Sequence, residues 1–193
     1  EVQEAMGSDD WLVIDGGNTH FWSEIAINMA GWRGKKLKGI LHPGAFSMLG
    51  VGVPFAIAAK LKHPKDNVVV ISGDGAFLSG GLSIEASFQE KAPITVVIDN
   101  NGGLTTISQQ QERLFGHNQH VATDFRDIPF HSMFEGLGGH GELVESQEQL
   151  QPALQRAFTC GKTACVNVNV RTQDAISPIV LATTNKRDKA SIE

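Results

Sequence analysis

Glycines beside small polar residues recur at three points of this 193-residue chain, each directly after a short apolar run. The three stretches are Asp15-Gly16-Gly17-Asn18-Thr19, Ser72-Gly73-Asp74-Gly75-Ala76 and Asp99-Asn100-Asn101-Gly102-Gly103. Glycine lets the backbone approach a ligand closely and present N–H groups to it. Asp and Asn supply hard oxygen ligands, which suit Mg²⁺ or Ca²⁺ better than Zn²⁺. An Asp after one strand and an Asn after the next could therefore share a metal ion over a phosphate group.

The apolar runs that precede these stretches predict buried strands, because they are short and rich in β-branched residues. The predicted strands are 11–14, 68–71, 94–98, 141–144 and 164–168. Helices are predicted over 48–61, 78–90 and 146–159, the last opened by a capping box of Ser146 and Gln149. Strands that alternate with helices predict an α/β fold: a doubly wound, mostly parallel sheet with helices on both faces. Such sheets bind ligands beyond the carboxyl ends of their strands.

Two simpler interpretations compete with a phosphate and metal site. Gly, Asn and Asp also dominate ordinary turns, so any one of the three stretches could be a turn alone. Their occurrence at three strand ends argues against that interpretation. A nicotinamide dinucleotide site requires G-x-G-x-x-G after the first strand, and the stretch that begins at Asp15 lacks it.

The composition of the chain excludes several classes of partner and indicates a cellular location. A net charge of −5 argues against a partner that is nucleic acid or an anionic membrane. Hydrophobic residues make up 41% of the chain, and no apolar run approaches the roughly 18 residues of a membrane span. Two cysteines give no disulfide framework, which favours a reducing, cytoplasmic location. The sequence begins with Glu rather than Met, so we expect a processed chain or a piece of a longer protein.

The spacing of two motifs resembles that of thiamine-diphosphate enzymes. Gly73-Asp74-Gly75, followed by a predicted helix and strand and then by Asn100-Asn101, is similar to their diphosphate motif. The segment 44–52 resembles the one that holds the pyrimidine ring of the cofactor. Together with 139–145 and the helix after it, these motifs resemble the acetolactate synthase, benzaldehyde lyase and 2-hydroxyacyl-CoA lyase group. The resemblance covers residues 11–170 and implies the C-terminal, diphosphate-binding domain of such an enzyme.

The resemblance implies roles for individual residues around the metal and the diphosphate. Asp74, Asn101 and the carbonyl of Gly103 would hold Mg²⁺, a ligand set that suits this ion. The phosphates would take N–H groups at the start of the helix that follows Gly73, and contacts from the first stretch. These residues are Gly75 and Ala76 on one side, and Gly17, Asn18 and Thr19 on the other. The family usually has a small hydroxylic residue where this chain has Ala76.

The resemblance also implies how the other half of the cofactor is bound. The carbonyl of Ser47 would accept a hydrogen bond from the aminopyrimidine, and the amide of Leu49 would reach a ring nitrogen. The Leu49 side chain would hold the cofactor in its bent conformation. On this basis we expect a thiamine-diphosphate- and Mg²⁺-dependent lyase, synthase or decarboxylase that acts on 2-oxo acids or 2-hydroxyacyl substrates, acyl-CoA thioesters among them.

One required group is expected outside this chain. The resemblance implies an activating glutamate on a pyrimidine-binding domain or subunit, so we expect no catalytic residue here, no turnover without that partner, and a homo- or hetero-oligomer. A non-catalytic subunit that kept the fold is the alternative; a nucleotide-binding Rossmann protein is a third.

We expect the cofactor-binding domain to occupy 1–170 and the polar tail 171–193 to be either a lid or disordered. A long loop over 102–127 should line the substrate entrance. Trp22 and Phe115 are candidates for its walls or for aromatic packing between domains. His117 and His120 lie three residues apart, but the sequence around them does not complete a zinc site.

Overall fold

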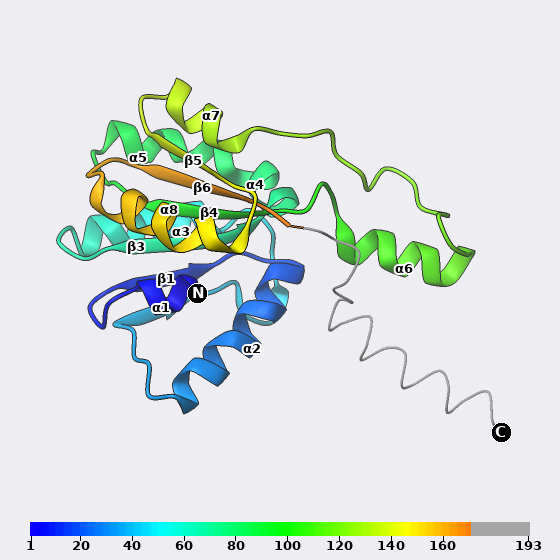
Figure 1. Cartoon of the computed structure of the whole chain (residues 1–193), viewed down its shortest axis with the longest axis horizontal. Coiled ribbons are helices and arrows are strands. Elements are labelled where there is room, and N and C mark those ends of the chain that lie inside the picture. Colours follow the sequence, from blue (N-terminus) through cyan, green and yellow to red (C-terminus); the bar gives the residue numbers. More distant parts are fainter. Residues whose placement is uncertain (171–193) are drawn as a thin grey trace.

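The computed structural model describes residues 1–170, and the predicted tail 171–193 lies outside the described residues (Figure 1). A parallel sheet in the order β2-β1-β3-β4-β6-β5 forms the centre. Its strands are Trp11–Ile14 (β1), Gly39–Leu41 (β2), Val68–Gly73 (β3), Thr95–Asn100 (β4), His140–Val144 (β5) and Ala164–Asn169 (β6). The predicted α/β class with a parallel sheet is confirmed.

Helices cover both faces of the sheet, because both faces of each central strand are apolar. Val13, Val70 and Val96 point to one face, whereas Leu12, Val69 and Val97 point to the other. The first face packs against α3 (Gly52–Lys62), α4 (Asp74–Gly80), α5 (Glu85–Gln89) and α7 (Phe130–Gly136). The second face packs against α1 (Val2–Ala5), α2 (Asn18–Trp32) and α8 (Gln147–Thr159). Within residues 1–170, no helix combines the length and apolarity needed to cross a bilayer.

The order of the strands creates a place for a ligand. From β1 the chain passes through α2 on one face to β2, and it returns through α3 on the opposite face to β3. The strands β2 and β3 therefore lie on opposite sides of β1. The segment that follows β1 leads toward β2 and the segment that follows β3 leads toward β4, so the two segments diverge at the carboxyl ends of these strands. This is the topological switch point at which doubly wound sheets bind ligands.

Several predictions about the elements were wrong or incomplete, and the short helices α1 and α7 were not predicted. The strand β2 and the helix α2 were missed; the buried residues of α2 are Thr19, His20 and Ser23, so no apolar stripe marks its inner side. The predicted loop 102–127 contains the helix α6 (Thr105–Phe115), which has no buried residue. The helix predicted from residue 48 begins at Gly52, after a 3₁₀ turn (Gly44–Phe46) and a left-handed Ser47.

The helix predicted over 78–90 is interrupted and starts earlier. It begins at Asp74, changes to a 3₁₀ turn at Gly81–Ile84 and continues as α5. The last predicted helix agrees with α8, and its capping box of Ser146 and Gln149 is confirmed. The glycines at 80 and 81 have low helix propensity, which explains why the regular helix ends there.

The arm of the molecule is formed by residues 104–129, which contain α6 and the segment that leads to α7. Figure 1 shows that the arm extends away from the sheet. His120 connects two segments of the arm, because its Nδ1 lies 3.1 Å from Glu112 Oε1 and its Nε2 lies 3.0 Å from Asp124 Oδ2. The base of the arm is joined to the body through Gly103, which forms an isolated bridge with Asp124.

Three phenylalanines fill the space between the sheet and its first helical layer. Phe77 of α4 meets Phe130 edge-on at a centroid distance of 5.5 Å and Phe134 at 5.9 Å. Phe130 and Phe134 have no exposed surface. This cluster holds α4 and α7 against the same face, so it also fixes where α4 begins.

We predict that Phe134→Ala lowers the free energy of unfolding by about 3–5 kcal/mol, because it leaves a cavity in close-packed surroundings. Urea denaturation of both forms measures the difference. The matched control is Phe115→Ala on the arm, where the side chain is 71% exposed and the change should stay within about 0.5 kcal/mol. Equal effects of the two variants would contradict this assignment of the core.

Candidate functional site

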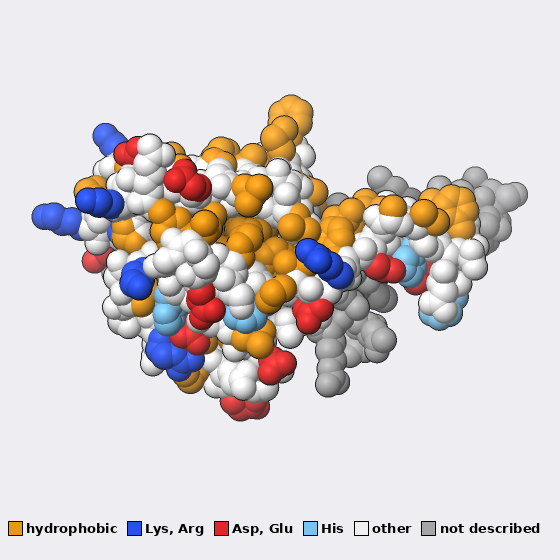
Figure 2. Space-filling model, turned by 90° about the horizontal axis from the view of Figure 1, so that it is seen from above, with side chains coloured by type: hydrophobic (Ala, Val, Ile, Leu, Met, Phe, Trp, Pro, Cys, Tyr) orange, Lys and Arg blue, Asp and Glu red, His pale blue; other side chains and the backbone are white. Residues whose placement is uncertain are grey.

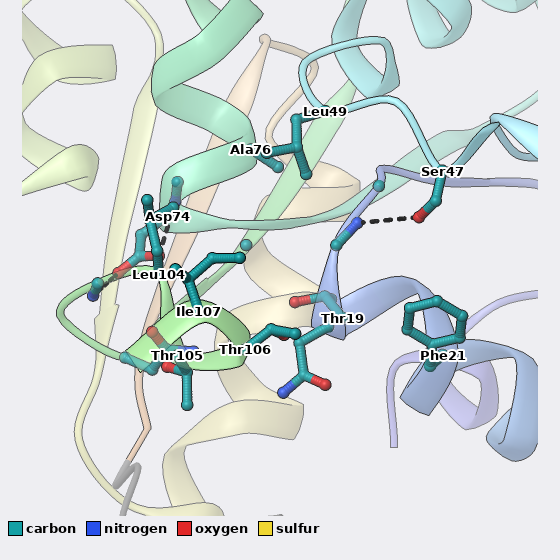
Figure 3. A pocket seen from close by; sticks show the side chains of 17 residues that line it. Thr19, Phe21, Ser47, Leu49, Asp74, Ala76, Leu104, Thr105, Thr106 and Ile107 are labelled. Atoms are coloured by element: carbon teal, nitrogen blue, oxygen red, sulfur yellow. Dashed lines mark hydrogen bonds between the residues drawn. The ribbon is translucent and has the colours of Figure 1, made fainter. Parts of the chain in front are cut away.

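A cavity of about 200 Å³ lies beyond the carboxyl ends of β1, β3 and β4 (Figure 3). Every residue that was predicted for the cofactor site lines this cavity. These residues are Gly17, Asn18, Thr19, Ser47, Leu49, Gly73, Asp74, Gly75, Ala76, Asn101 and Gly103. Segments up to 86 residues apart in the sequence thus meet at one place, which is the switch point of the sheet.

The cavity has further walls that the sequence analysis did not find. They are formed by Gly16, Phe21, Leu104, Thr105, Thr106 and Ile107. Four of these, residues 104–107, lie in the segment 102–127 that was predicted as a loop lining the substrate entrance, and they form the base of the arm and the start of α6. Trp22 and Phe115, the candidates for walls of the substrate entrance or for packing between domains, do not line this cavity, whereas Phe21 does.

Three helices start at the wall of this cavity. The first residues of α2, α4 and α6 are Asn18, Asp74 and Thr105, and all three line it. The first N–H groups of a helix have no acceptor within the helix, and the helix dipole is positive at this end. Three such ends around one hollow make a site suited to an anion, and a diphosphate has the required charge.

The carboxylate of Asp15 holds the cavity's walls together. Its Oδ1 accepts hydrogen bonds from the N–H groups of Gly16 and Gly50, both at 2.8 Å, and its Oδ2 accepts one from Ser72 Oγ at 2.9 Å. The side chain is almost completely buried. One residue thus connects the end of β1, the turn before α3 and the end of β3.

Close backbone contact at Gly16 completes this connection. A Cβ atom on Gly16 would collide with the carbonyl oxygens of Ser47 and Met48. Only glycine therefore allows the loop after β1 to lie against the turn at 47–50. The same contact fixes the position of the Ser47 carbonyl, the group that the sequence assigned to the pyrimidine ring.

The turn at 47–50 presents two further groups. Ser47 has left-handed backbone angles (φ 44°, ψ 38°), and its Oγ accepts a hydrogen bond from the Gly17 N–H at 3.3 Å. Leu49 extends into the cavity beside Ala76 (Figure 3). An exposed fraction of 40% leaves the Leu49 side chain accessible to a bound molecule.

The carboxylate of Asp74 bridges two of the strand ends. Its Oδ1 accepts from the Gly75 N–H at 2.6 Å, and its Oδ2 accepts from the Gly103 N–H at 2.9 Å. Burial raises the pKa of Asp74 above its ordinary value, and the backbone hydrogen bonds oppose this shift. The charge of Asp99 raises the pKa of Asp74 further. A nearby cation would relieve both unfavourable effects.

Asp99, at the end of β4, lies behind the cavity. Its Oδ2 accepts a hydrogen bond from Thr19 Oγ1 at 2.9 Å, which connects β4 to the first turn of α2. Burial raises the pKa of Asp99, and the Thr19 hydrogen bond opposes the shift. The sequence analysis gave Asp99 no role; its place directly before Asn100-Asn101 was the available signal.

Several oxygen atoms at the cavity lack a partner. Asn18 Oδ1, Asn101 Oδ1 and Thr106 Oγ1 are buried without a hydrogen bond. Buried polar atoms usually have one, and exceptions point to a missing ligand or ion. The Asn101 oxygen and the Asp74 carboxylate therefore fit a hard metal ion. The third predicted metal ligand, the Gly103 carbonyl, accepts the Thr105 N–H at 3.0 Å, and its second lone pair remains available.

The fold and the cavity define an α/β domain with a hollow at the switch point of its sheet, lined by helix starts and hard oxygen atoms that suit an anionic ligand and a metal ion. Residues 15–168 match the family "Thiamine pyrophosphate enzyme, C-terminal TPP binding domain", and the chain belongs to this family. This confirms the resemblance inferred from the two motifs. Domains of this family bind the diphosphate of thiamine diphosphate.

The curated relatives are longer enzymes. The chain is 39% identical over 170 residues to the acetolactate synthase large subunit of Mycobacterium tuberculosis, covering 87% of this chain and 30% of that one. It is 33% identical over 178 residues to human 2-hydroxyacyl-CoA lyase 2, covering 90% of this chain and 27% of that one. The chain thus spans about a third or less of the relatives it matches.

We predict that Asp15→Ala lowers the free energy of unfolding by about 3 kcal/mol, because it leaves two buried N–H groups and a hydroxyl without their acceptor. Asp15→Asn should cost about 1 kcal/mol. Its amide oxygen still accepts from Gly16 and Gly50, and its nitrogen donates to Ser72 Oγ.

Urea denaturation of the three forms measures these differences, with Asp9→Ala at an exposed position as the control. An Asp15→Ala variant as stable as the control would show that the carboxylate does not hold these segments together.

Proposed function

We propose that this chain supplies the diphosphate and metal half of the active site in a thiamine-diphosphate- and Mg²⁺-dependent enzyme that cleaves or forms carbon–carbon bonds. One observation carries the proposal: oxygen atoms of Asp74 and Asn101 meet three helix starts in a single cavity. The oxygen atoms suit the metal, and the helix starts suit the phosphates that the metal bridges.

The metal would be held by Asp74, Asn101 and the carbonyl of Gly103. A carboxylate, an amide oxygen and a carbonyl leave room for phosphate oxygens and water in an octahedral shell. Burial of Asp74 supports the assignment, because its charge is unfavourable until a cation arrives. The unpaired Asn101 Oδ1 supports it independently.

The phosphates would lie between the starts of α2 and α4. Gly73, Gly75 and Ala76 form the wall on one side; Asn18 and Thr19, preceded by Gly17, form it on the other. Thr19 is already fixed by its hydrogen bond to Asp99, so it can orient the first turn of α2. The start of α6 adds the Thr106 hydroxyl, which is buried without a hydrogen-bond partner and was not predicted from the sequence.

The turn at 47–50 would receive the pyrimidine ring. The Ser47 carbonyl and the Leu49 N–H are its proposed hydrogen-bonding groups, and the Leu49 side chain would support the bent conformation. When bound, the cofactor supplies a carbon nucleophile and an electron sink. The residues of this chain would position the cofactor, stabilise the charge of its diphosphate and hold it against the apolar wall of the cavity.

The substrate would be a 2-oxo acid or a 2-hydroxyacyl compound, including acyl-CoA thioesters. The names of the relatives, acetolactate synthase and 2-hydroxyacyl-CoA lyase, support this range. A second hollow of about 560 Å³ adjoins the cavity and is bounded by Ser108, Glu112 and His120 of the arm. We propose that this hollow is the entrance for the substrate.

The rest of the active site would come from a pyrimidine-binding domain or subunit that carries the activating glutamate. Hydrophobic side chains gather over the middle of one face and along the arm (Figure 2). The arm itself exposes Ile107, Leu114, Phe115 and Val121. Exposed apolar surface of this kind is typical of an interface, which supports an oligomeric assembly in which residues 1–170 form one domain.

We predict that thiamine diphosphate binds this chain only together with Mg²⁺, and that Asp74→Ala and Asn101→Ala each weaken binding by about 100-fold or more, because even groups that only orient a metal ligand cost 10–100-fold. Isothermal titration calorimetry measures the affinities. Asp127→Ala, at an exposed position on the arm, is the control and should bind like the wild type.

Wild-type binding no better than that of Asp74→Ala would contradict the proposal and favour a non-catalytic subunit with this fold. Binding of NAD in a parallel titration would favour a nucleotide-binding protein instead. The chain alone should turn over neither 2-oxo acids nor 2-hydroxyacyl-CoA thioesters, so measurable turnover without a partner would contradict the division of the active site.

A further inference from the structure

Three metal-ligating side chains meet outside the cavity, on the far side of the Ser47 turn. His20 and Glu24 lie one helical turn apart on α2, and His42 follows β2 directly. Their ligand atoms all lie within 4.8 Å of one another. His20 Nε2 is 3.1 Å from Glu24 Oε1, which is 4.0 Å from His42 Nδ1.

The buried member of this cluster has an unsatisfied atom that faces the other two. His20 is 3% exposed, and its Nε2 is buried without a properly aligned hydrogen bond despite the short distance to Glu24. The two imidazole rings lie 5.4 Å apart, with an angle of 38° between their planes. A cation between the rings and the carboxylate would give His20 Nε2 a partner and neutralise Glu24. His42 Nδ1 accepts the Gly44 N–H at 3.2 Å, so this nitrogen would exchange that hydrogen bond for the metal.

We propose that His20, Glu24 and His42 bind a divalent transition-metal ion of the Zn²⁺ type. Two imidazoles and a carboxylate form a nitrogen-rich ligand set that favours Zn²⁺ over Mg²⁺. Bonds of about 2.0–2.1 Å in a tetrahedron place ligand atoms about 3.3 Å apart. The 3.1 Å from His20 Nε2 to Glu24 Oε1 is close to this spacing, whereas the 4.0 Å from Glu24 Oε1 to His42 Nδ1 must shorten when the metal binds. Glu24 and His42 are partly exposed and can rotate toward it, and the fourth position is left for water.

The metal would also act on the second nitrogen of His20. When Nε2 binds a metal, the ring proton is on Nδ1, which then donates to a neighbouring acceptor. Here the neighbour is Ser47 Oγ at 3.2 Å, which already accepts the Gly17 N–H. Metal binding would therefore stabilise the contact between the loop after β1 and the Ser47 turn. This consequence for the cofactor rests on the proposed function, whereas the metal site itself does not.

The first experiment titrates Zn²⁺ into chelator-treated protein in competition with a chromogenic chelator. We expect one equivalent to bind, and Glu24→Gln and His42→Gln each to weaken it by about 100-fold or more, because even groups that only orient a ligand cost 10–100-fold. His120→Gln is the matched control, since His120 also lies between two carboxylates but has no second histidine. The Zn²⁺ affinity of His120→Gln should equal that of the wild type.

Both variants replace partly exposed side chains, and circular dichroism would verify their folding. Co²⁺ should give the strong visible absorption of a tetrahedral site in the wild type but not in His42→Gln. Failure to bind Zn²⁺, or equal affinity in His42→Gln and wild type, would overturn the proposal and leave an ordinary contact between a histidine and a carboxylate.

Asp74→Ala separates the two sites. It should weaken the Mg²⁺-dependent binding of thiamine diphosphate by about 100-fold or more and leave the Zn²⁺ affinity unchanged. Loss of Zn²⁺ binding in Asp74→Ala would show that the Zn²⁺ site is not separate from the cofactor site and would overturn the proposal. A wild-type protein that does not bind the cofactor would contradict only the proposed function.

Discussion

The hydrogen bonds of Asp15 determine whether a site can exist in this fold. The sheet brings the ends of β1 and β3 side by side, whereas the turn at 47–50 belongs to the connection between the edge strand β2 and the helix α3. The buried carboxylate accepts from the turn at Gly50, from its own loop at Gly16 and from β3 at Ser72. Because three donors converge on one charged group, the arrangement tolerates little change of angle or distance.

The cavity combines two opposite electrostatic demands within about 200 Å³. The starts of α2, α4 and α6 favour an anion, whereas Asp74 and Asp99 are buried carboxylates whose raised pKa values show that their charges are poorly solvated. A diphosphate with a divalent cation satisfies both demands, because the cation lies against the carboxylates and the phosphates lie against the N–H groups. Either ion alone would leave one set of groups unsatisfied, which explains why their binding should be linked.

Much of the fold and of the cofactor site was predictable from the sequence, because most of the residues concerned directly follow short apolar runs that predict strands. The four strong runs correspond to β1, β3, β4 and β6. The glycine-rich ends of the first three hold the predicted cofactor residues other than Ser47 and Leu49, which came from the resemblance of segment 44–52. What could not be predicted lacks such a signal. The buried residues of α2 are polar, so no apolar stripe marks this helix. The helix α6 buries no side chain against the sheet, so it is not part of the apolar core from which the other helices were predicted. The cluster of His20, Glu24 and His42 depends on the position of β2, which is three residues long and was not predicted either.

The central claim is that one cavity binds the diphosphate and the metal together. A crystal structure with thiamine diphosphate and Mn²⁺ tests it most directly, because the anomalous signal of manganese locates the ion independently of the protein's density. We predict a manganese peak bonded to Asp74, Asn101 and the Gly103 carbonyl, with the diphosphate between the starts of α2 and α4. Cofactor density elsewhere, or a diphosphate in the cavity with no metal at Asp74, would contradict the account.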